Sequence, residues 1–203
     1  FPVIPKCRLL SVAALLFPVA LAGCHVETHK DGRNNNVDIG TPFGGLSVKT
    51  DEPATLSKLG LTPYPGATLV RKHNGEDGTA DVNLSLGDFK LGVQAADLQT
   101  TDGQDKVLAF YRKDMRRYGA VLTCRGQDTV GQPTRTADGL TCNTNQDHPG
   151  GDEMQLRAGS ESHQHIVGLH AEDGGTRIGL VALDLPFKLK SFNIKTHGGD
   201  DRE

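Results

Sequence analysis

Apolar and polar residues alternate with a period of two in several parts of this chain. Residues 82–86 read Val-Asn-Leu-Ser-Leu. Since successive side chains of a strand point to opposite faces of a sheet, this alternation is typical of a strand with one buried face. The same alternation returns in residues 89–96, after a Gly-Asp turn. The pattern therefore predicts two strands that follow each other directly.

Further strands are expected where similar runs are bounded by turn residues. Residues 67–73 and 80–86 flank Asn-Gly-Glu-Asp-Gly, which predicts a hairpin. Residues 165–171 and 176–183 flank Glu-Asp-Gly-Gly, which predicts a second hairpin. Shorter strands are expected at residues 46–50, 120–124, 139–142 and 154–158.

One segment has the period of a helix instead. Thr101 or Asp102 is expected to cap its N-terminus, and Gly119 is expected to end it. Its apolar residues fall on one face at spacings of three and four: Val107, Leu108, Tyr111, Met115 and Tyr118. Because strands are expected on both sides of this helix, the sequence predicts an α+β fold, an antiparallel β-sheet packed with one main amphipathic helix.

The N-terminal residues form a different pattern. Residues 9–22 are almost all apolar and follow two basic residues, Lys6 and Arg8. This run is shorter than the roughly 20 residues that cross a bilayer as a helix, and it is typical of a secretory signal peptide. It ends in Leu-Ala-Gly-Cys at residues 21–24, which resembles the lipobox of bacterial lipoproteins. The resemblance implies cleavage before Cys24 and acylation of Cys24, palmitate included, which would hold the chain on a membrane.

This interpretation sets the expected organisation of the chain. The polar, Asn-rich stretch after Cys24 buries too little apolar surface to fold alone, so it is expected to be a tether. In lipoproteins of hosts with two membranes, Asp after the lipidated cysteine favours the inner membrane. Here that residue is His25, which implies the outer membrane, facing the periplasm. The expected parts are a signal peptide at residues 1–23, a lipid-anchored flexible tether at 24–45, a single domain at 46–196 and a flexible tail at 197–203.

The four cysteines are expected to have different fates. Cys7 would leave with the signal peptide and Cys24 would carry lipid, so Cys124 and Cys142 remain. An even pair in an oxidising compartment favours a disulfide. Two unpaired buried cysteines are the alternative.

Composition excludes one class of partner. The formal net charge of the 203 residues is −3, and removal of the leader, with two basic residues and no acidic one, makes it more negative. Such a domain lacks the basic footprint of a nucleic-acid-binding protein, so no nucleic acid partner is expected. The 25 glycines and the absence of tryptophan fit a β-rich, turn-rich body.

Candidate chemistry is limited to histidines. His163 and His165 are two residues apart, hence on the same face of the expected strand. A zinc site needs three or four ligands, so this pair would need a distant contributor such as His73 or His148. A solvent-facing pair is the alternative. The chain has no G-x-S-x-G elbow, Walker A loop or dinucleotide fingerprint, so no catalytic residue and no cofactor is expected.

Two motifs resemble a group of poorly characterised exported bacterial proteins. They are Tyr-Pro-Gly-Ala at residues 64–67 and the Phe-Tyr pair at residues 110–111 of the expected helix. The resemblance spans roughly residues 60–125 and implies no particular reaction or ligand. The motif has a structural interpretation, in which Pro65 and Gly66 form a turn and Tyr64 packs against the helix.

These observations favour a membrane-anchored envelope lipoprotein that acts as a non-enzymatic binding or interaction module. An envelope protein, a peptide or cell-wall material is the expected kind of partner. The alternative is an envelope enzyme, a metal-assisted hydrolase that would use His163 and His165.

Overall fold

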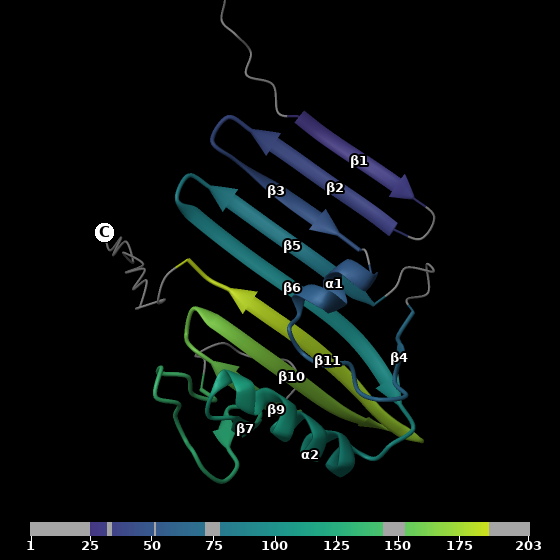
Figure 1. Ribbon diagram of the computed structural model, residues 1–203, viewed down its shortest axis with the longest axis vertical. Helices are drawn as coiled ribbons and strands as arrows, with labels where there is room; N and C mark the ends of the chain where they lie inside the picture. The colour runs from purple at the N-terminus through teal and green to yellow at the C-terminus, as the bar shows by residue number, and fades with distance from the viewer. Residues whose placement is uncertain (1–24, 32–33, 51, 72–77, 144–152, 187–203) are drawn as a thin grey trace, which may run out of the picture.

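The strands of this protein form a wide antiparallel sheet (Figure 1). The structure, a computed structural model, describes residues 25–31, 34–50, 52–71, 78–143 and 153–186. Across the sheet the strands lie in the order β1-β2-β3-β5-β6-β11-β10-β9-β7-β8, and β4 pairs with β6 beside the end of β5. The strands are β1 (His25–Asp31), β2 (Asn34–Thr41), β3 (Gly44–Lys49), β4 (Thr68–Leu69), β5 (Thr79–Leu86), β6 (Phe89–Thr100), β7 (Leu122–Arg125), β8 (Asp128–Thr129), β9 (Met154–Gly159), β10 (His163–Glu172) and β11 (Gly175–Asp184).

The helices lie on one face of this sheet, as Figure 1 shows. Helix α1 (Glu52–Lys58) contacts β5 and β6, and helix α2 (Gln104–Asp114) contacts β9, β10 and β11. A 3₁₀ turn, η1 (Met115–Tyr118), continues α2. The main core is the layer between these helices and the sheet, where Val107, Tyr111 and Met115 pack against Leu98, Ile178 and other buried strand residues.

The antiparallel sheet and the packed helix are confirmed, but the balance between them is different. Within the described residues the protein is mainly β, and α+β describes it only loosely. The expected hairpin of β10 and β11 forms, with Glu172 opposite Gly175 at its turn. The strand expected at residues 89–96 also forms as β6.

The hairpin expected between residues 67–73 and 80–86 is wrong. Among the described residues of this segment, 67–71, Thr68 and Leu69 form the strand β4, which pairs with β6 rather than with β5. β5 pairs with β3 and β6 instead. Local turn residues predicted this pairing. In the structure β3 and β6 occupy the two edges of β5, so the tertiary structure decides the cross-strand partners of β5.

The flexible tether expected after Cys24 is corrected by the structure. Residues 25–31 and 34–41 form β1 and β2, which pair over seven residues from His25 opposite Gly40 to Asp31 opposite Asn34. The stretch is too polar to fold alone, but it gains its backbone hydrogen bonds by adding to the edge of an existing sheet. The strand expected at residues 46–50 is confirmed as part of β3.

The helix end at Gly119 is confirmed, with φ at 105°, whereas the expected N-cap is wrong. Gly103 occupies the N-cap position of α2 and makes no side-chain capping hydrogen bond. Asp102 instead accepts hydrogen bonds from the Tyr64 hydroxyl at 2.7 Å and from the Lys106 ammonium at 2.9 Å. The Tyr64 ring also lies edge-on to Phe110, with centroids 5.1 Å apart, so Tyr64 packs against the helix as predicted.

In the part of the chain that the structure describes, no helix is long and apolar enough to cross a membrane. The predicted signal peptide, Cys24, His73, His148 and the tail at residues 197–203 lie outside the described residues.

Candidate functional site

The sheet face opposite the helices is the most extensive candidate surface of this protein. On β6 its side chains are Leu91, Val93, Ala95 and Asp97, which alternate with the helix-facing Gln94, Ala96 and Leu98. We call this surface the open face, and it comprises these β6 side chains and the strand residues that oppose them on the same side of the sheet. Within the described ranges, α1, α2 and η1 all lie on the other side.

Aliphatic side chains form two lines across the open face, each made of residues that oppose one another in neighbouring strands. Val26 is 59% exposed and the other aliphatic members are half-buried. The first line is Val26, Ile39, Leu46, Leu84 and Leu91, from β1 to β6. The second begins at the polar Thr28 and continues through the aliphatic residues Val37, Val48, Val82, Val93 and Leu183, from β1 to β11.

The polarity of the sheet is inverted between its two halves. Around β6, β11 and β10 the apolar side faces the helices and forms the core. In the β1, β2 and β3 half, the helix-side positions are polar, with Glu27 opposite Asp38 and Asp38 opposite Ser47. The apolar side of this half is therefore the open face, which the described residues leave without a covering layer of helices. Contiguous exposed apolar surface of this kind marks interaction sites.

Two exposed apolar side chains extend the open face at the hairpin tips. Phe43, in the turn between β2 and β3, is 83% exposed, and Leu86, at the end of β5, is 51% exposed. The two turns are joined, because the Gly87 amide donates a hydrogen bond of 3.1 Å to the Phe43 carbonyl. Large apolar groups therefore stand at the rim of the aliphatic lines.

A hollow of about 420 Å³ lies in the open face near β4. Ala80, Ala95 and Val181 line it and oppose one another across β5, β6 and β11. Asp97 and Arg177 also line it, and the Arg177 guanidinium donates hydrogen bonds to both carboxylate oxygens of Asp97. These hydrogen bonds raise the pKa of Arg177. An apolar hollow with a few oriented polar groups is a common form of ligand site.

Gly179 lines this hollow. Gly168 and Gly179 oppose each other in the ladder of β10 and β11. A Cβ atom at Gly179 would meet no atom within 4 Å, so the space above it is empty. A Cβ at Gly168 would come within 2.8 Å of a carboxylate oxygen of Glu153, which therefore lies over that glycine. The missing side chain at Gly179 thus contributes to the depth of the hollow.

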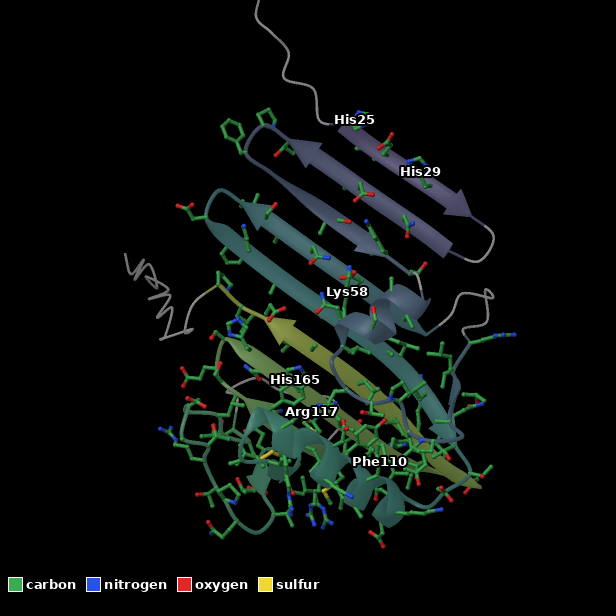
Figure 2. All side chains as sticks on the ribbon, viewed as in Figure 1. His25, His29, Lys58, Phe110, Arg117 and His165 are labelled. Carbon is green, nitrogen blue, oxygen red and sulfur yellow. A yellow bond between two sulfur atoms is a disulfide. The ribbon has the colours of Figure 1, made fainter. Side chains whose placement is uncertain are left out.

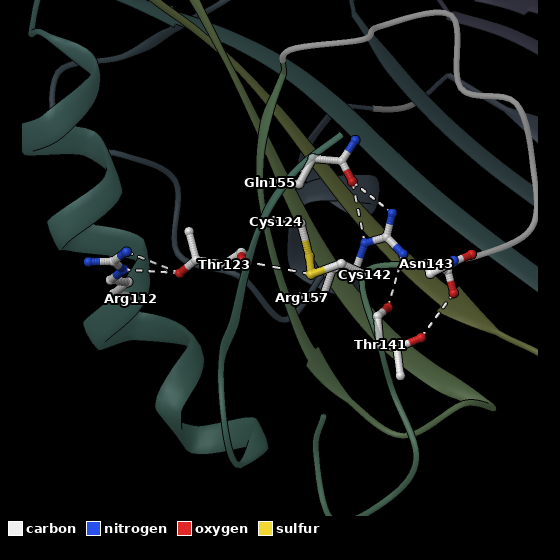
Figure 3. Close-up of a disulfide and its surroundings, with 8 residues drawn as sticks. All are labelled: Arg112, Thr123, Cys124, Thr141, Cys142, Asn143, Gln155 and Arg157. Atoms are coloured by element: carbon white, nitrogen blue, oxygen red, sulfur yellow. Dashed lines mark hydrogen bonds between the residues drawn. A yellow bond between two sulfur atoms is a disulfide. The ribbon is translucent and has the colours of Figure 1, made fainter. Parts of the chain in front are cut away.

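A disulfide-bonded segment closes the open face at the other end of the sheet (Figure 3). The predicted bond between Cys124 and Cys142 is present, with Cα atoms 5.5 Å apart. The strand expected at residues 139–142 does not form. Cys142 lies in an irregular segment whose Leu140 packs with Leu122 and both cysteines in a second small core. This segment covers the side of β7 that continues the open face.

Arg157 lies beneath this segment on β9. It is only 3% exposed, and its guanidinium donates hydrogen bonds to the Gln155 side chain at 2.9 Å and to the Thr141 carbonyl at 3.5 Å (Figure 3). Burial lowers the pKa of Arg157. The buried guanidinium ties the disulfide-bonded segment to the sheet.

The two predicted metal-site histidines lie on the helix side of β10, in different surroundings. His163 is exposed, with its Nε2 3.9 Å from a carboxylate oxygen of Asp184. His165 is half-buried and stacks on Tyr118, with ring centroids 3.6 Å apart. Burial lowers the pKa of His165. Among the residues that the structure describes, no group of three or more His, Cys, Asp or Glu side chains could hold a metal ion.

Ser162, His163 and Asp184 are arranged in the order of a catalytic triad, but their geometry does not support one. The Ser162 hydroxyl lies 3.0 Å from His163 Nδ1, whereas the distance of 3.9 Å from His163 Nε2 to Asp184 is too long for a hydrogen bond. The side chains of His163 and Asp184 are 69% and 63% exposed. A solvated histidine of this kind is not held in place for nucleophilic catalysis.

One buried carboxylate lies under α1, at the base of the sheet half that carries the aliphatic lines. Asp81 is 1% exposed and accepts hydrogen bonds from Lys58 at 2.6 Å, Asn83 at 2.8 Å and Gln94 at 3.0 Å. Burial alone would raise the pKa of Asp81, but these hydrogen bonds outweigh it and lower the pKa. Both oxygens of the carboxylate accept hydrogen bonds that join α1 to β5 and β6, so Asp81 has a structural role.

Sequence reasoning missed the open face, although a signal was present. Residues 37–39 and 46–48 read Val-Asp-Ile and Leu-Ser-Val, an alternation that predicts strands. The first of these falls in the expected tether, because its neighbours are polar and Asn-rich. Comparisons with protein-family models, curated proteins and solved structures found no match to this chain.

Proposed function

We propose that this chain is a membrane-anchored envelope lipoprotein that works as a non-enzymatic binding module facing the periplasm. Support for the anchor comes from the sequence, where a short apolar leader ends in Leu-Ala-Gly-Cys at residues 21–24. Two or more acyl chains on Cys24 would hold the domain stably on a membrane. His25 after this cysteine favours the outer membrane in a host that has two.

The open face is the observation that carries the binding role. Its two aliphatic lines cross from β1 to β6 and to β11, and their members are half-buried or exposed. Apolar surface removed from water contributes about 25 cal/mol for each Å², and the loss of translational and rotational freedom on association opposes this gain. A flat aliphatic surface suits a protein or peptide, whereas a sugar polymer would require polar contacts. Among the expected partners, the open face therefore favours an envelope protein or a peptide.

The alternative, a metal-assisted hydrolase, has less support. It would act through His163 and His165, and His165 is stacked on Tyr118 rather than directed to an open site. The described residues bring no third ligand to the pair.

The anchor is tested by labelling the chain with radioactive palmitate in a bacterial host. We expect Cys24→Ser to remove the label and to release the protein from the membrane fraction. Cys7→Ser is the matched control, because it removes a thiol of the same leader, and it should retain both. Equal labelling of the two variants would contradict the anchor.

The binding face is tested by placing a photo-cross-linking amino acid at Val48 or at its neighbour Ser47. The two residues are adjacent on β3, and Val48 belongs to the open face whereas Ser47 belongs to the opposite side. We expect cross-linked adducts with an envelope protein or peptide from position 48 and few from position 47. Equal adducts from both positions, or none from either, would overturn this function of the open face.

A further inference from the structure

The strand β1 forms an edge of the sheet within the described part of the chain. It pairs with β2 along its whole length of seven residues, and the register shows no bulge. Figure 2 shows His25 and His29 on this outer strand. An edge strand presents a row of unpaired N–H and C=O groups, which proteins commonly block with proline, a bulge or charged side chains. β1 has no proline and no bulge, and its charged residues are Glu27, Lys30 and Asp31.

We propose that this edge is a self-association surface, on which β1 of a second copy of the chain adds in antiparallel orientation. Thr28 is the middle residue of β1, and the twofold axis of this dimer passes beside it. All seven residues of β1 then pair with the partner strand. An antiparallel addition of this kind is the twofold form of strand augmentation.

The length of the paired stretch and the side chains of β1 together select this register. An axis at Val26 or at Lys30 would also place an acid opposite a histidine, but it would pair only a few of the seven residues of β1. Residues directly opposite each other in an antiparallel pair share a face, so a twofold axis must lie beside a residue rather than between two. An axis at Thr28 places Glu27 opposite the partner's His29, and it does so twice by symmetry. An axis at Glu27 would oppose two carboxylates, which is destabilising, and an axis at His29 would oppose two imidazoles.

The chemistry of this pair is complementary. A carboxylate only accepts hydrogen bonds, and an imidazole has an N–H to donate in either protonation state. Within β1 the Glu27 carboxylate already lies 3.7 Å from His25 and 3.8 Å from His29. Its side chain is 55% exposed and that of His29 is 66% exposed, so both are accessible to a second copy. Opposite threonines at the axis also form a favourable cross-strand pair.

The dimer would also enlarge the open face. Thr28 belongs to the second aliphatic line, where it opposes Val37. A twofold axis perpendicular to the sheet keeps the same face of both copies on the same side. The line through Thr28 would therefore continue into the same line of the partner. This inference does not require the lipid anchor or the partner proposed for the open face.

Cross-linking of the full chain in envelope membranes tests the register. We expect Thr28→Cys, oxidised with copper phenanthroline, to give a disulfide-linked dimer that a reductant converts back to monomers on a denaturing gel. The chain without this substitution measures the background from its own cysteines. Val26→Cys is the matched control, because the proposed register separates the two introduced cysteines by roughly 14 Å, beyond disulfide range.

Charge variants of the Thr28→Cys chain test the Glu27–His29 pair. Glu27→Lys places an ammonium opposite His29, and His29→Glu places a second carboxylate opposite Glu27, so we expect each alone to weaken dimerisation about tenfold. The two variants are then co-expressed with different tags. In the mixed dimer the introduced lysine lies opposite the introduced glutamate. The original Glu27 of one copy lies opposite the original His29 of the other. The mixed dimer should therefore recover, which also demonstrates that both variants fold.

The combined outcomes distinguish a β1 dimer from an unoccupied edge. A covalent dimer from Thr28→Cys that the single charge changes weaken and the mixture restores would support the proposal. Absence of a Thr28→Cys dimer, or equal dimers from Val26→Cys, would overturn it. A mixture that is no better than the single variants would also overturn it. Palmitate labelling of Cys24 is independent of these outcomes, so failure of the anchor and failure of the dimer are distinguishable.

Discussion

The ring of Tyr118 lies flat on the imidazole of His165, with centroids 3.6 Å apart and ring planes 11° apart. Figure 2 shows His165 next to Arg117, at the end of the helical segment. The Tyr118 hydroxyl donates a hydrogen bond to the Gly60 carbonyl, and the Arg117 guanidinium donates to the same carbonyl at 2.5 Å. The stacked pair and these hydrogen bonds connect the end of η1, the segment after α1 and β10.

Stability should depend on the protonation of His165. Burial lowers the pKa of His165 below its ordinary 6.5, so near and below pH 6.5 the unfolded chain binds more protons at this residue than the folded one. The contribution of neutral His165 to the free energy of unfolding is therefore complete above pH 6.5, and it is lost as the pH falls through the pKa of His165 in the folded chain. Urea unfolding between pH 8 and pH 5 gives the slope of the unfolding free energy against pH. The substitution His165→Gln should reduce this slope. An unchanged slope in the variant would contradict the role of His165.

Two glycines with similar backbone geometry should respond differently to alanine. Gly60 has φ at +64° and Gly66 at +77°, so either substitution costs about 1–2 kcal/mol of backbone strain. A Cβ at Gly60 would also lie 2.6 Å from the Tyr118 hydroxyl, whereas a Cβ at Gly66 meets nothing within 4 Å. Gly60→Ala should therefore lose about 1–3 kcal/mol more than Gly66→Ala in chemical denaturation. Equal losses of stability in the two variants would show that the Tyr118 side chain moves away from the new Cβ without an energetic cost.

The Tyr64 hydroxyl should stabilise the packing of the helix on its turn. Tyr64→Phe keeps the ring contact with Phe110 but removes the hydrogen bond to Asp102, so we expect a loss of about 1 kcal/mol. Tyr64→Ala also removes the buried ring and should lose about 3–5 kcal/mol. Thermal unfolding of the two variants measures the contribution of the hydrogen bond and that of the buried ring. A loss for Tyr64→Phe as large as that for Tyr64→Ala would mean that the ring contributes little.

Loss of the disulfide should destabilise the closed end of the open face. The bond joins residues 18 positions apart, which corresponds to about 3 kcal/mol in the chain-entropy description. The double variant Cys124→Ala with Cys142→Ala should unfold at correspondingly lower denaturant concentration. Mass spectrometry without reductant should find these two thiols bonded in the parent chain. A parent chain with two free thiols at these positions would contradict the bond.

The sequence could predict the elements whose signals are local. The hairpin of β10 and β11 has alternating strands and a Gly-Gly turn next to each other in the chain, so its pairing needs no other information. Helix α2 and its continuation η1 share one apolar face, and the helical segment ends at Gly119. Helix α1 has no such local signal, since it has only seven residues and depends on contacts such as that between Lys58 and Asp81.

The candidate site could not be predicted in the same way. The open face consists of residues such as Val26, Val48 and Val93, which come from distant segments and meet only through cross-strand pairing. His163 and His165 share a side of β10 as their spacing predicts, but only packing decides that one is solvated and the other covered by Tyr118.

By itself, the sequence determined the strand periods, the amphipathic helix and the choice of Cys124 and Cys142 as partners, because each follows from residue types at short spacing or from cysteine arithmetic. Only the tertiary structure decided that residues 25–31 and 34–41 are strands, that β5 pairs with β3, and that the apolar side of the sheet changes face between its halves. The physical reason is that a strand obtains its hydrogen bonds and its buried face from other strands, which a local pattern does not specify.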